Sequence, residues 1–309
     1  MKRYQRILVC IDQPERDLRM LSYAWTVARL AESKEIHLLH VSEDKARESE
    51  DLPHVSSMPD EVTRETLRTL ATEYIKEPAT QKCLCEVIHG SPLLEILRFA
   101  YEKDIDLIII GRHYGEVADT DDDALQARRI TRKATCSVLV LPEEHQIKAD
   151  TILVPVRDSE CSANALDVAC GIAAATNATI IALNVYQVHA GYSRSGVTLQ
   201  QHQLLLDEAA QRECGSLLKR VDTRSLAVQC KCTPDLHGKP VQAFLESITS
   251  LSADLVVIGA RGRTGAAGVL LGNVTEQLIR KSPVPVLAVK KKGECLGVLR
   301  ALLSLSQEA

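Results

Sequence analysis

The stretch Ala253-Asp-Leu-Val-Val-Ile258 runs directly into Gly259-Ala-Arg-Gly262, and after nine further residues comes the pair Gly272-Asn273. The apolar run predicts a buried strand, and the run from Val274 to Lys281 has the pattern of an amphipathic helix. The glycines therefore lie between a strand and a helix, where backbone N–H groups and the positive end of the helix dipole attract phosphate. Asn273, with Glu276 three residues later, is predicted to cap that helix.

Two interpretations of this loop stay open on its residues alone. Glycines between a strand and a helix often only make turns, and the spacing matches neither the GxxxxGK(S/T) nor the GxGxxG phosphate motif. The stretch does resemble the G-x2-G-x9-G-S/T nucleotide loop of the universal stress protein family, with Asn273 where that family usually has serine or threonine. The resemblance continues through Pro283-Val-Pro-Val-Leu-Ala-Val289, which matches the family's last strand.

The composition fits two globular domains of ordinary size. The chain has 309 residues, of which 45% are hydrophobic and 25% are charged, and its net charge is −4. A chain of this composition and charge lacks the excess of basic residues that nucleic-acid-binding proteins use. The apolar residues 166–186 are interrupted by Asp167, Thr176 and Asn177, which argues against a membrane span, and the N-terminus lacks the apolar core of a signal peptide. We expect a cytoplasmic protein that binds neither nucleic acid nor membrane.

Several motifs recur at about half the chain length, which indicates an internal duplication. The matching segments are Arg6 to Asp12 with Thr151 to Arg157, His89 to Leu97 with His237 to Leu245, Asp106 to Gly111 with Asp254 to Gly259, and Ser137 to Pro142 with Pro285 to Lys290. We therefore expect a first domain over residues 1–145, a second over residues 149–292, and a tail helix within residues 293–309.

Within each half, predicted strands alternate with predicted helices. The strands are expected at residues 5–11, 35–41, 82–88, 105–110 and 137–141, and then at 151–156, 178–186, 226–232, 253–258 and 285–290. The helices are expected at residues 15–33, 59–77, 92–103 and 123–134, and then at 160–176, 198–221, 240–251 and 274–281. This order predicts an α/β fold in which each half is a five-stranded parallel sheet flanked by helices.

The ten cysteines raise the question of a metal site. Two CxC pairs, each followed by a histidine, are Cys83 and Cys85 with His89, and Cys230 and Cys232 with His237. Residues two apart on a strand share one face, so each pair could offer two thiolates to zinc. Structural zinc sites generally use CxxC in loops, however, and free cysteine in a strand behaves as a small apolar residue. We expect buried strand cysteines and no metal.

Both halves resemble universal stress protein domains, and the resemblance extends from Tyr4 to Lys290. It implies a tandem member of that family, built from two Rossmann-like domains of the adenine nucleotide alpha hydrolase-like type. Some members bind ATP, and members pair through their final strand. In a tandem chain Ser137 to Leu141 and Pro285 to Val289 would pair antiparallel as an internal pseudo-dimer. Whether two chains associate further stays open.

The resemblance assigns the nucleotide to one half rather than to both. The first half keeps the family's strand-end aspartate as Asp12, but its phosphate loop is degraded. Gly115 comes one residue late, the segment from Asp119 to Asp123 carries four acidic side chains, and Gln126 to Arg129 replaces the Gly-Ser start of the helix. The acidic side chains repel a triphosphate. We expect no nucleotide in the first half.

The second half keeps the loop apart from Asn273, but Arg157 replaces the aspartate. Because arginine has only donors, Asp158 is the candidate acceptor for the nucleoside, and Arg157 would face a phosphate. Arg261 and Arg263 are either phosphate ligands or solvated loop residues. The expected nucleotide-binding residues are Pro155, Val156, Arg157, Asp158, Val185, Gly259, Arg261, Gly262, Arg263, Gly272, Asn273, Val274 and Thr275.

The sequence favours a binding protein over an enzyme. It has no GxSxG, no HExxH and no Walker lysine. The leading hypothesis is a stress-response regulator that binds ATP or a related adenine nucleotide, with or without Mg²⁺, and acts on a protein partner that the sequence does not identify. The alternative is a nucleotide-free scaffold, and slow ATP hydrolysis is less favoured because no residues for positioning water are evident.

Overall fold

The computed structural model describes residues 3–13, 17–42, 60–74, 81–114, 124–188, 198–260 and 271–292. They divide into two compact units: the first contains the described residues within 3–143 and Lys292, and the second runs from Glu144 to Lys291. The predicted tail helix, the acidic segment at 119–123 and the residues Arg261, Gly262 and Arg263 lie outside the described residues.

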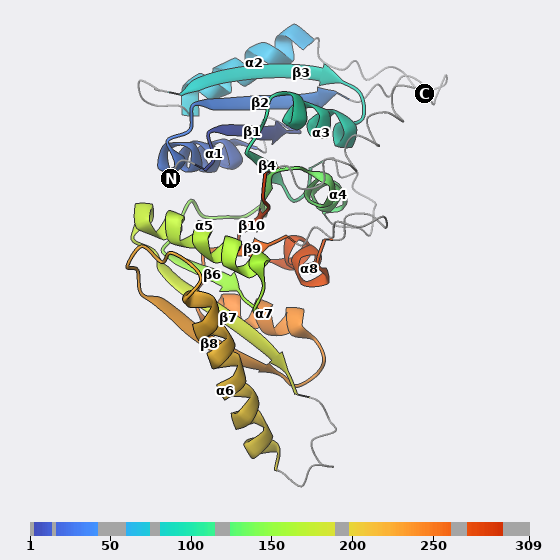
Figure 1. The fold of residues 1–309 in the computed structure, drawn as a ribbon. Helices are drawn as coiled ribbons and strands as arrows, with labels where there is room; N and C mark the ends of the chain where they lie inside the picture. Colours follow the sequence, from blue (N-terminus) through green and yellow to red (C-terminus); the bar gives the residue numbers. More distant parts are fainter. Residues whose placement is uncertain are drawn as a thin grey trace, which may run out of the picture. The chain divides into compact units, whose positions relative to one another are not determined.

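Each unit contains five strands and four helices among its described residues. The first unit has β1 (Arg6–Ile11), α1 (Leu18–Ala31), β2 (Glu35–Ser42), α2 (Asp60–Tyr74), β3 (Lys82–His89), α3 (Pro92–Glu102), β4 (Leu107–Gly111), α4 (Leu125–Lys133) and β5 (Ser137–Leu141) (Figure 1). The second has β6 (Thr151–Pro155), α5 (Glu160–Thr176), β7 (Thr179–Gln187), α6 (Leu199–Leu218), β8 (Val228–Asp235), α7 (Pro240–Ser250), β9 (Leu255–Gly259), α8 (Asn273–Lys281) and β10 (Val286–Val289).

The two units have the same strand order, β3-β2-β1-β4-β5 in the first and β8-β7-β6-β9-β10 in the second. Pairing within each unit is parallel. In each unit the first three strands follow one another toward one edge of the sheet. The fourth strand then pairs with the opposite side of the first, and the fifth pairs with the fourth. Right-handed crossovers therefore put the first two helices of each unit on one face and the last two on the other. Contacts of α1 with α2, α3 with α4, α5 with α6, and α7 with α8 agree with this arrangement. The predicted α/β fold is confirmed.

The duplication is visible in individual hydrogen bonds. In the first unit, Asp106 Oδ2 accepts from the backbone N–H groups of Gln5 and Arg6 at 2.9 and 3.0 Å. In the second, Asp254 Oδ2 accepts from Asp150 and Thr151 at 3.0 and 2.9 Å. In both units, one aspartate before the fourth strand thus satisfies the donors at the start of the first strand. The matching Asp-Leu motifs of the sequence reflect this shared role.

The central strands form the core of each unit. The side chains from Ile7 to Ile11 and from Leu107 to Ile110 are almost fully buried, as are those from Ile152 to Val154 and from Val256 to Ile258. Strands covered on both faces bury side chains in both directions, which explains their uninterrupted apolar sequences. In the described part of the chain, no helix has the length and apolar character needed to cross a membrane.

Candidate functional site

A cavity of about 280 Å³ opens at the carboxyl ends of β6 and β9 in the second unit. Strand β6 pairs with β7 on one side and with β9 on the other, so the chain reverses its order across the sheet at this point. Ligands of open α/β sheets bind at such a switch point, because the loops on either side diverge and leave a crevice. The cavity therefore lies where this topology places a binding site.

Eight of the thirteen expected nucleotide-binding residues line this one cavity. They are Pro155, Val156, Arg157, Gly259, Gly272, Asn273, Val274 and Thr275. Val185 is buried in β7, the Asp158 side chain pairs with Arg220, and neither residue belongs to the lining. The other three, at 261–263, are outside the described residues. Two segments separated by about a hundred residues in the sequence thus meet at one place.

Further lining residues were not expected from the sequence. They are Ser159, Cys161, Ser162, Pro240, Phe244 and Ile258. The first three lie at the start of α5, and Pro240 and Phe244 belong to the first turns of α7. The His-Gly-x-Pro motif that recurs in both halves was a usable signal for Pro240, since proline at that place favours a helix start.

The lining brings the N-terminal turns of α5, α7 and α8 to a single cavity. The first turn of a helix has backbone N–H groups without a helical partner, and the aligned peptide dipoles give that end partial positive charge. Arg157, an exposed side chain, adds a full positive charge to the lining. Among the described lining residues there is no carboxylate. The cavity is therefore suited to an anion.

The predicted capping role of Asn273 is wrong, although the helix does begin at this residue. Gly272 is the N-cap, with the extended dihedrals φ −62° and ψ 139°, and it has no side chain with which to cap the helix. Asn273 is already helical, so its side chain reaches along the helix surface and its Oδ1 accepts from Gln277 Nε2 at 2.9 Å. With glycine as the N-cap, no side chain at that position covers the start of α8.

Gly259 has a packing role that the sequence did not indicate. A Cβ at this position would lie 2.4 Å from the carbonyl oxygen of Cys161 and 2.6 Å from its carbonyl carbon. The end of β9 thus packs directly against the first turn of α5, because Gly259 has no side chain. By contrast, a Cβ at Gly272 would meet its nearest neighbour, Thr275 Oγ1, at an ordinary 3.6 Å.

Hydrogen bonds from α5 and α6, together with an ion pair from Arg220, hold the loop between β6 and α5. Ser162 Oγ accepts from the backbone N–H of Arg157 at 3.0 Å, and Ser159 caps α5 by accepting from the N–H of Ser162 at 3.2 Å. Glu213 of α6 accepts from the N–H of Asp158 at 2.7 Å, and Arg220 forms an ion pair with the Asp158 carboxylate. The carboxylate expected to accept from a nucleoside is therefore paired with Arg220, which follows α6.

The equivalent loop of the first unit is built around a charge. Asp17 Oδ2 accepts from the N–H groups of Asp12 and Gln13 at 2.9 and 3.1 Å. Asp17 stands five residues after Asp12, as Ser162 stands five residues after Arg157, so a carboxylate replaces a hydroxyl. Both loops make the same backbone contact, but the Asp17 carboxylate would repel a bound anion, whereas the Ser162 hydroxyl carries no charge.

The start of the fourth helix also differs between the units. In the first unit α4 begins at Leu125 behind Ala124, which is fully buried and has left-handed dihedrals. The helix was predicted to begin at residue 123, two residues before its observed start. A buried methyl group occupies the position that corresponds to Gly272.

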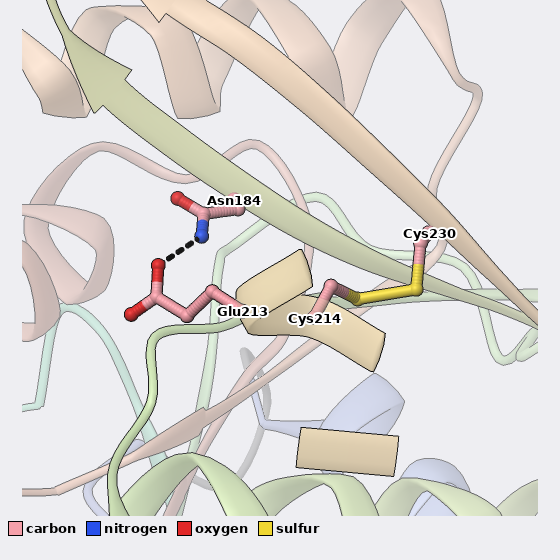
Figure 2. The surroundings of a disulfide bond; sticks show 4 residues. All are labelled: Asn184, Glu213, Cys214 and Cys230. Atoms are coloured by element: carbon pink, nitrogen blue, oxygen red, sulfur yellow. Dashed lines mark hydrogen bonds between the residues drawn. A yellow bond between two sulfur atoms is a disulfide. The ribbon is translucent and has the colours of Figure 1, made fainter. Parts of the chain in front are cut away.

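A disulfide between Cys214 and Cys230 corrects the interpretation of the second cysteine pair (Figure 2). Cys230 is neither a buried strand thiol nor available to a metal. Spacing could not reveal the bond, because its partner lies in a predicted helix. In the first unit Cys83 and Cys85 are half-buried and not disulfide-bonded. Within the described residues, no cluster of three or more histidine, cysteine or acidic side chains is placed to hold a metal ion.

Comparison with known proteins agrees with this fold. The sequence model of the universal stress protein family matches the chain twice, at residues 3–142 and 148–290. Universal stress protein MJ0531 of Methanocaldococcus jannaschii is 32% identical over 141 residues, which cover 45% of this chain and 81% of that protein. Universal stress protein YxiE of Bacillus subtilis is 27% identical over 151 residues, which cover 45% and 99%.

Two solved structures share the tandem fold over almost the whole chain. The functionally unknown protein PA1789 of Pseudomonas aeruginosa superposes with a TM-score of 0.69 at 18% identity, covering 100% of this chain and 99% of its own. A universal stress protein of Archaeoglobus fulgidus gives a TM-score of 0.61 at 18% identity, covering 93% and 98%. At this identity the likeness shows the fold alone. With both halves matched by the family model, the chain belongs to the universal stress protein family as a tandem member.

Proposed function

We propose that the second half binds ATP or a related adenine nucleotide in the cavity at the ends of β6 and β9. The observation that carries the proposal is the meeting of three helix N-termini and Arg157 at a cavity whose described lining has no carboxylate. Phosphate binds at helix N-termini because their N–H groups and dipoles favour negative charge. The protein then acts in the stress response as a nucleotide-dependent regulator of a protein partner.

The chemistry of the lining suggests which residues contact the base and which contact the phosphates. Pro155, Val156 and Phe244 offer apolar surface to a base, whereas Gly272 to Thr275 offer backbone donors to phosphates. Arg157 strengthens the attraction for a triphosphate through charge-assisted hydrogen bonds, for which adenosine has no phosphate partner. A magnesium ion would come with the phosphates, because the described lining supplies hydroxyl and amide oxygens but no carboxylate.

Calorimetric titration of the full chain with ATP and with adenosine tests this proposal. The decisive variant is Ser162→Asp, which keeps an acceptor for the N–H of Arg157 but introduces the charge of the first unit. We expect ATP affinity to fall more than about tenfold, since like charges a few ångströms apart repel by several kcal/mol in a partly buried site. Adenosine affinity should change much less. The matched control is Asp17→Ser in the first unit, which should leave ATP binding unchanged.

Arg157→Ala provides an independent second test. A charge-assisted hydrogen bond contributes about 1.5–3 kcal/mol, so ATP should bind at least about tenfold more weakly while adenosine is unaffected. If neither variant changes ATP affinity, or if Asp17→Ser changes it instead, the site is not the one proposed.

One observation favours the alternative of a nucleotide-free scaffold. Leu204 and Leu205 on α6 are 61% and 56% exposed, and adjacent apolar side chains on a long helix are suited to contact with another protein. Native mass spectrometry of the freshly purified chain separates the two functions. Bound adenine nucleotide supports the regulator, and its absence together with no binding in the titration supports the scaffold.

A further inference from the structure

The disulfide joins α6 to the edge of the second unit's sheet (Figure 2). Cys214 of α6 is 1% exposed, whereas Cys230 lies on an exposed part of β8, the outer strand that pairs with β7. The Cα atoms are 6.4 Å apart. A thiol reagent can therefore approach the bond from the Cys230 side.

Helix α6 buries few of its side chains completely. Of the described side chains in this 20-residue helix, three are buried, namely Ala210, Cys214 and Leu217. An alanine and one leucine bury little apolar area. The cross-link at Cys214 therefore adds to an attachment that otherwise consists of this small apolar contact, half-buried side chains and the hydrogen bonds of Glu213.

Glu213, next to Cys214 in α6, connects this helix to the cavity. Its two carboxylate oxygens accept from Asn184 Nδ2 and from the N–H of Asp158, each at 2.7 Å. Figure 2 shows the bond to Asn184 beside the disulfide. Because Asp158 stands between Arg157 and Ser159, which both line the cavity, displacement of α6 removes a support from the cavity wall.

The first unit serves as an internal comparison. Its third strand also carries a CxC pair, Cys83 and Cys85, but the helix α2, which packs against that strand, has no cysteine. The cross-link is therefore specific to the half that contains the candidate nucleotide site.

We propose that Cys214–Cys230 is a redox-active site whose state sets the conformation of the β6–α5 loop, and thereby the nucleotide affinity of the cavity. The proposed change in the loop is based on the hydrogen bonds of Glu213. The proposed change in nucleotide affinity rests, in addition, on the proposed function. Oxidised, the bond holds α6 and the loop in the arrangement described. Reduced, it releases both.

A dithiol is the chemical class of reductant that completes the reaction. One of its thiolates attacks Cys230 Sγ, the sulfur–sulfur bond breaks, and Cys214 leaves as a thiolate that takes up a proton. The second thiol of the reagent then displaces Cys230 as a thiol and closes the reagent's own disulfide. Two electrons and two protons pass to the protein. Burial raises the pKa of Cys232, two residues along β8, and keeps it a poor competitor as a nucleophile.

The first test is differential alkylation of the full chain followed by peptide mass spectrometry. In protein purified without reductant, Cys214 and Cys230 should resist labelling under denaturing conditions, and both should become labelled after treatment with dithiothreitol. Labelling of both residues before reduction would overturn the proposal.

The second test is hydrogen exchange of the full chain without nucleotide. Dithiothreitol, or the Cys230→Ser change, should speed exchange of residues 157–159 and of α6 by about tenfold, because local opening becomes easier. Cys232→Ser is the matched control and should behave as the parent protein. In Glu213→Ala the loop should already exchange rapidly, and reduction should accelerate only α6. Equal loop exchange in oxidised and reduced parent protein would overturn the coupling.

ATP titration of both redox states completes the test. We expect ATP to bind about tenfold more weakly after reduction, both in the parent protein and in Cys232→Ser, which keeps the disulfide. Cys230→Ser should bind ATP as weakly as the reduced parent, with or without reductant. If the loop responds but neither state binds ATP, the proposed function fails and the redox coupling stands. If both states bind ATP equally, the effect of the disulfide on affinity is excluded.

Discussion

Gly259 illustrates how one absent side chain brings two elements together. Because a Cβ there would lie 2.4 Å from the carbonyl oxygen of Cys161, Gly259→Ala must push β9 and α5 apart. Overpacking of this kind costs about 1–3 kcal/mol. We expect the urea midpoint of the second unit to fall accordingly, in the absence of any ligand.

Gly215→Ala is the matched control for this change. Nothing lies within 4 Å of a Cβ at Gly215, and alanine is preferred over glycine inside a helix by about 1 kcal/mol. The control should therefore be neutral or stabilising. If Gly259→Ala were equally well tolerated, the close contact with Cys161 would not constrain the fold.

We expect the stability of the first unit to depend on pH through His37. Its side chain is 2% exposed, and its ring lies edge-on to that of Phe99, with 5.4 Å between the ring centroids. Its ring nitrogens have no hydrogen-bond partner among the described residues. Burial lowers the pKa of His37, and the nearby Glu35 opposes that shift only in part. The folded state therefore binds its proton at a lower pH than the unfolded state does.

Stability should consequently fall as the pH drops below the unfolded value of about 6.5, and continue falling until the folded pKa is reached. At pH 5.5 the loss is at most about 1.4 kcal/mol. His37→Phe keeps the aromatic contact and removes the titration. Urea unfolding at pH 7.5 and 5.5 should show a smaller loss in the variant than in the parent, and equal losses would assign the dependence to other groups.

At the scale of elements, periodicity predicted most of the fold. The predicted bounds of α5 and β5 agree with the structure, because Ser159 caps α5 and an unbroken apolar run forms β5. The prediction for β8 ended at Cys232, whereas the strand continues through Pro234 to Asp235. As the outer strand of its sheet, β8 tolerates a proline that a central strand would not.

The candidate site could be predicted only where it rests on local patterns. The residues around Gly272 follow from the order of strand, glycines and helix, which the sequence states directly. The roles of Ser162, Glu213 and Cys214 do not, because each depends on a contact between segments far apart in the chain. The orientation of Asp158 likewise depends on Arg220, 62 residues later.

At the scale of the whole molecule, the family resemblance predicts that β5 and β10 pair with each other as an internal pseudo-dimer. Within their own units these strands pair with β4 and β9. Parallel strands direct successive N–H groups to opposite sides, so a strand with one neighbour leaves every second amide without a sheet partner. If the predicted pairing forms, β5 and β10 should have slowly exchanging amides on both sides.

Hydrogen exchange with residue resolution tests this prediction, and β3 and β8 provide the internal reference. Both are outer strands in their units, so every second amide in them should exchange rapidly. Protection of β5 and β10 that is independent of protein concentration indicates pairing within one chain. Protection that is lost on dilution indicates that two chains supply the partner strands instead. Exchange in β5 and β10 as rapid as in β8 would contradict the pseudo-dimer, because a paired edge cannot leave half of its amides open to water.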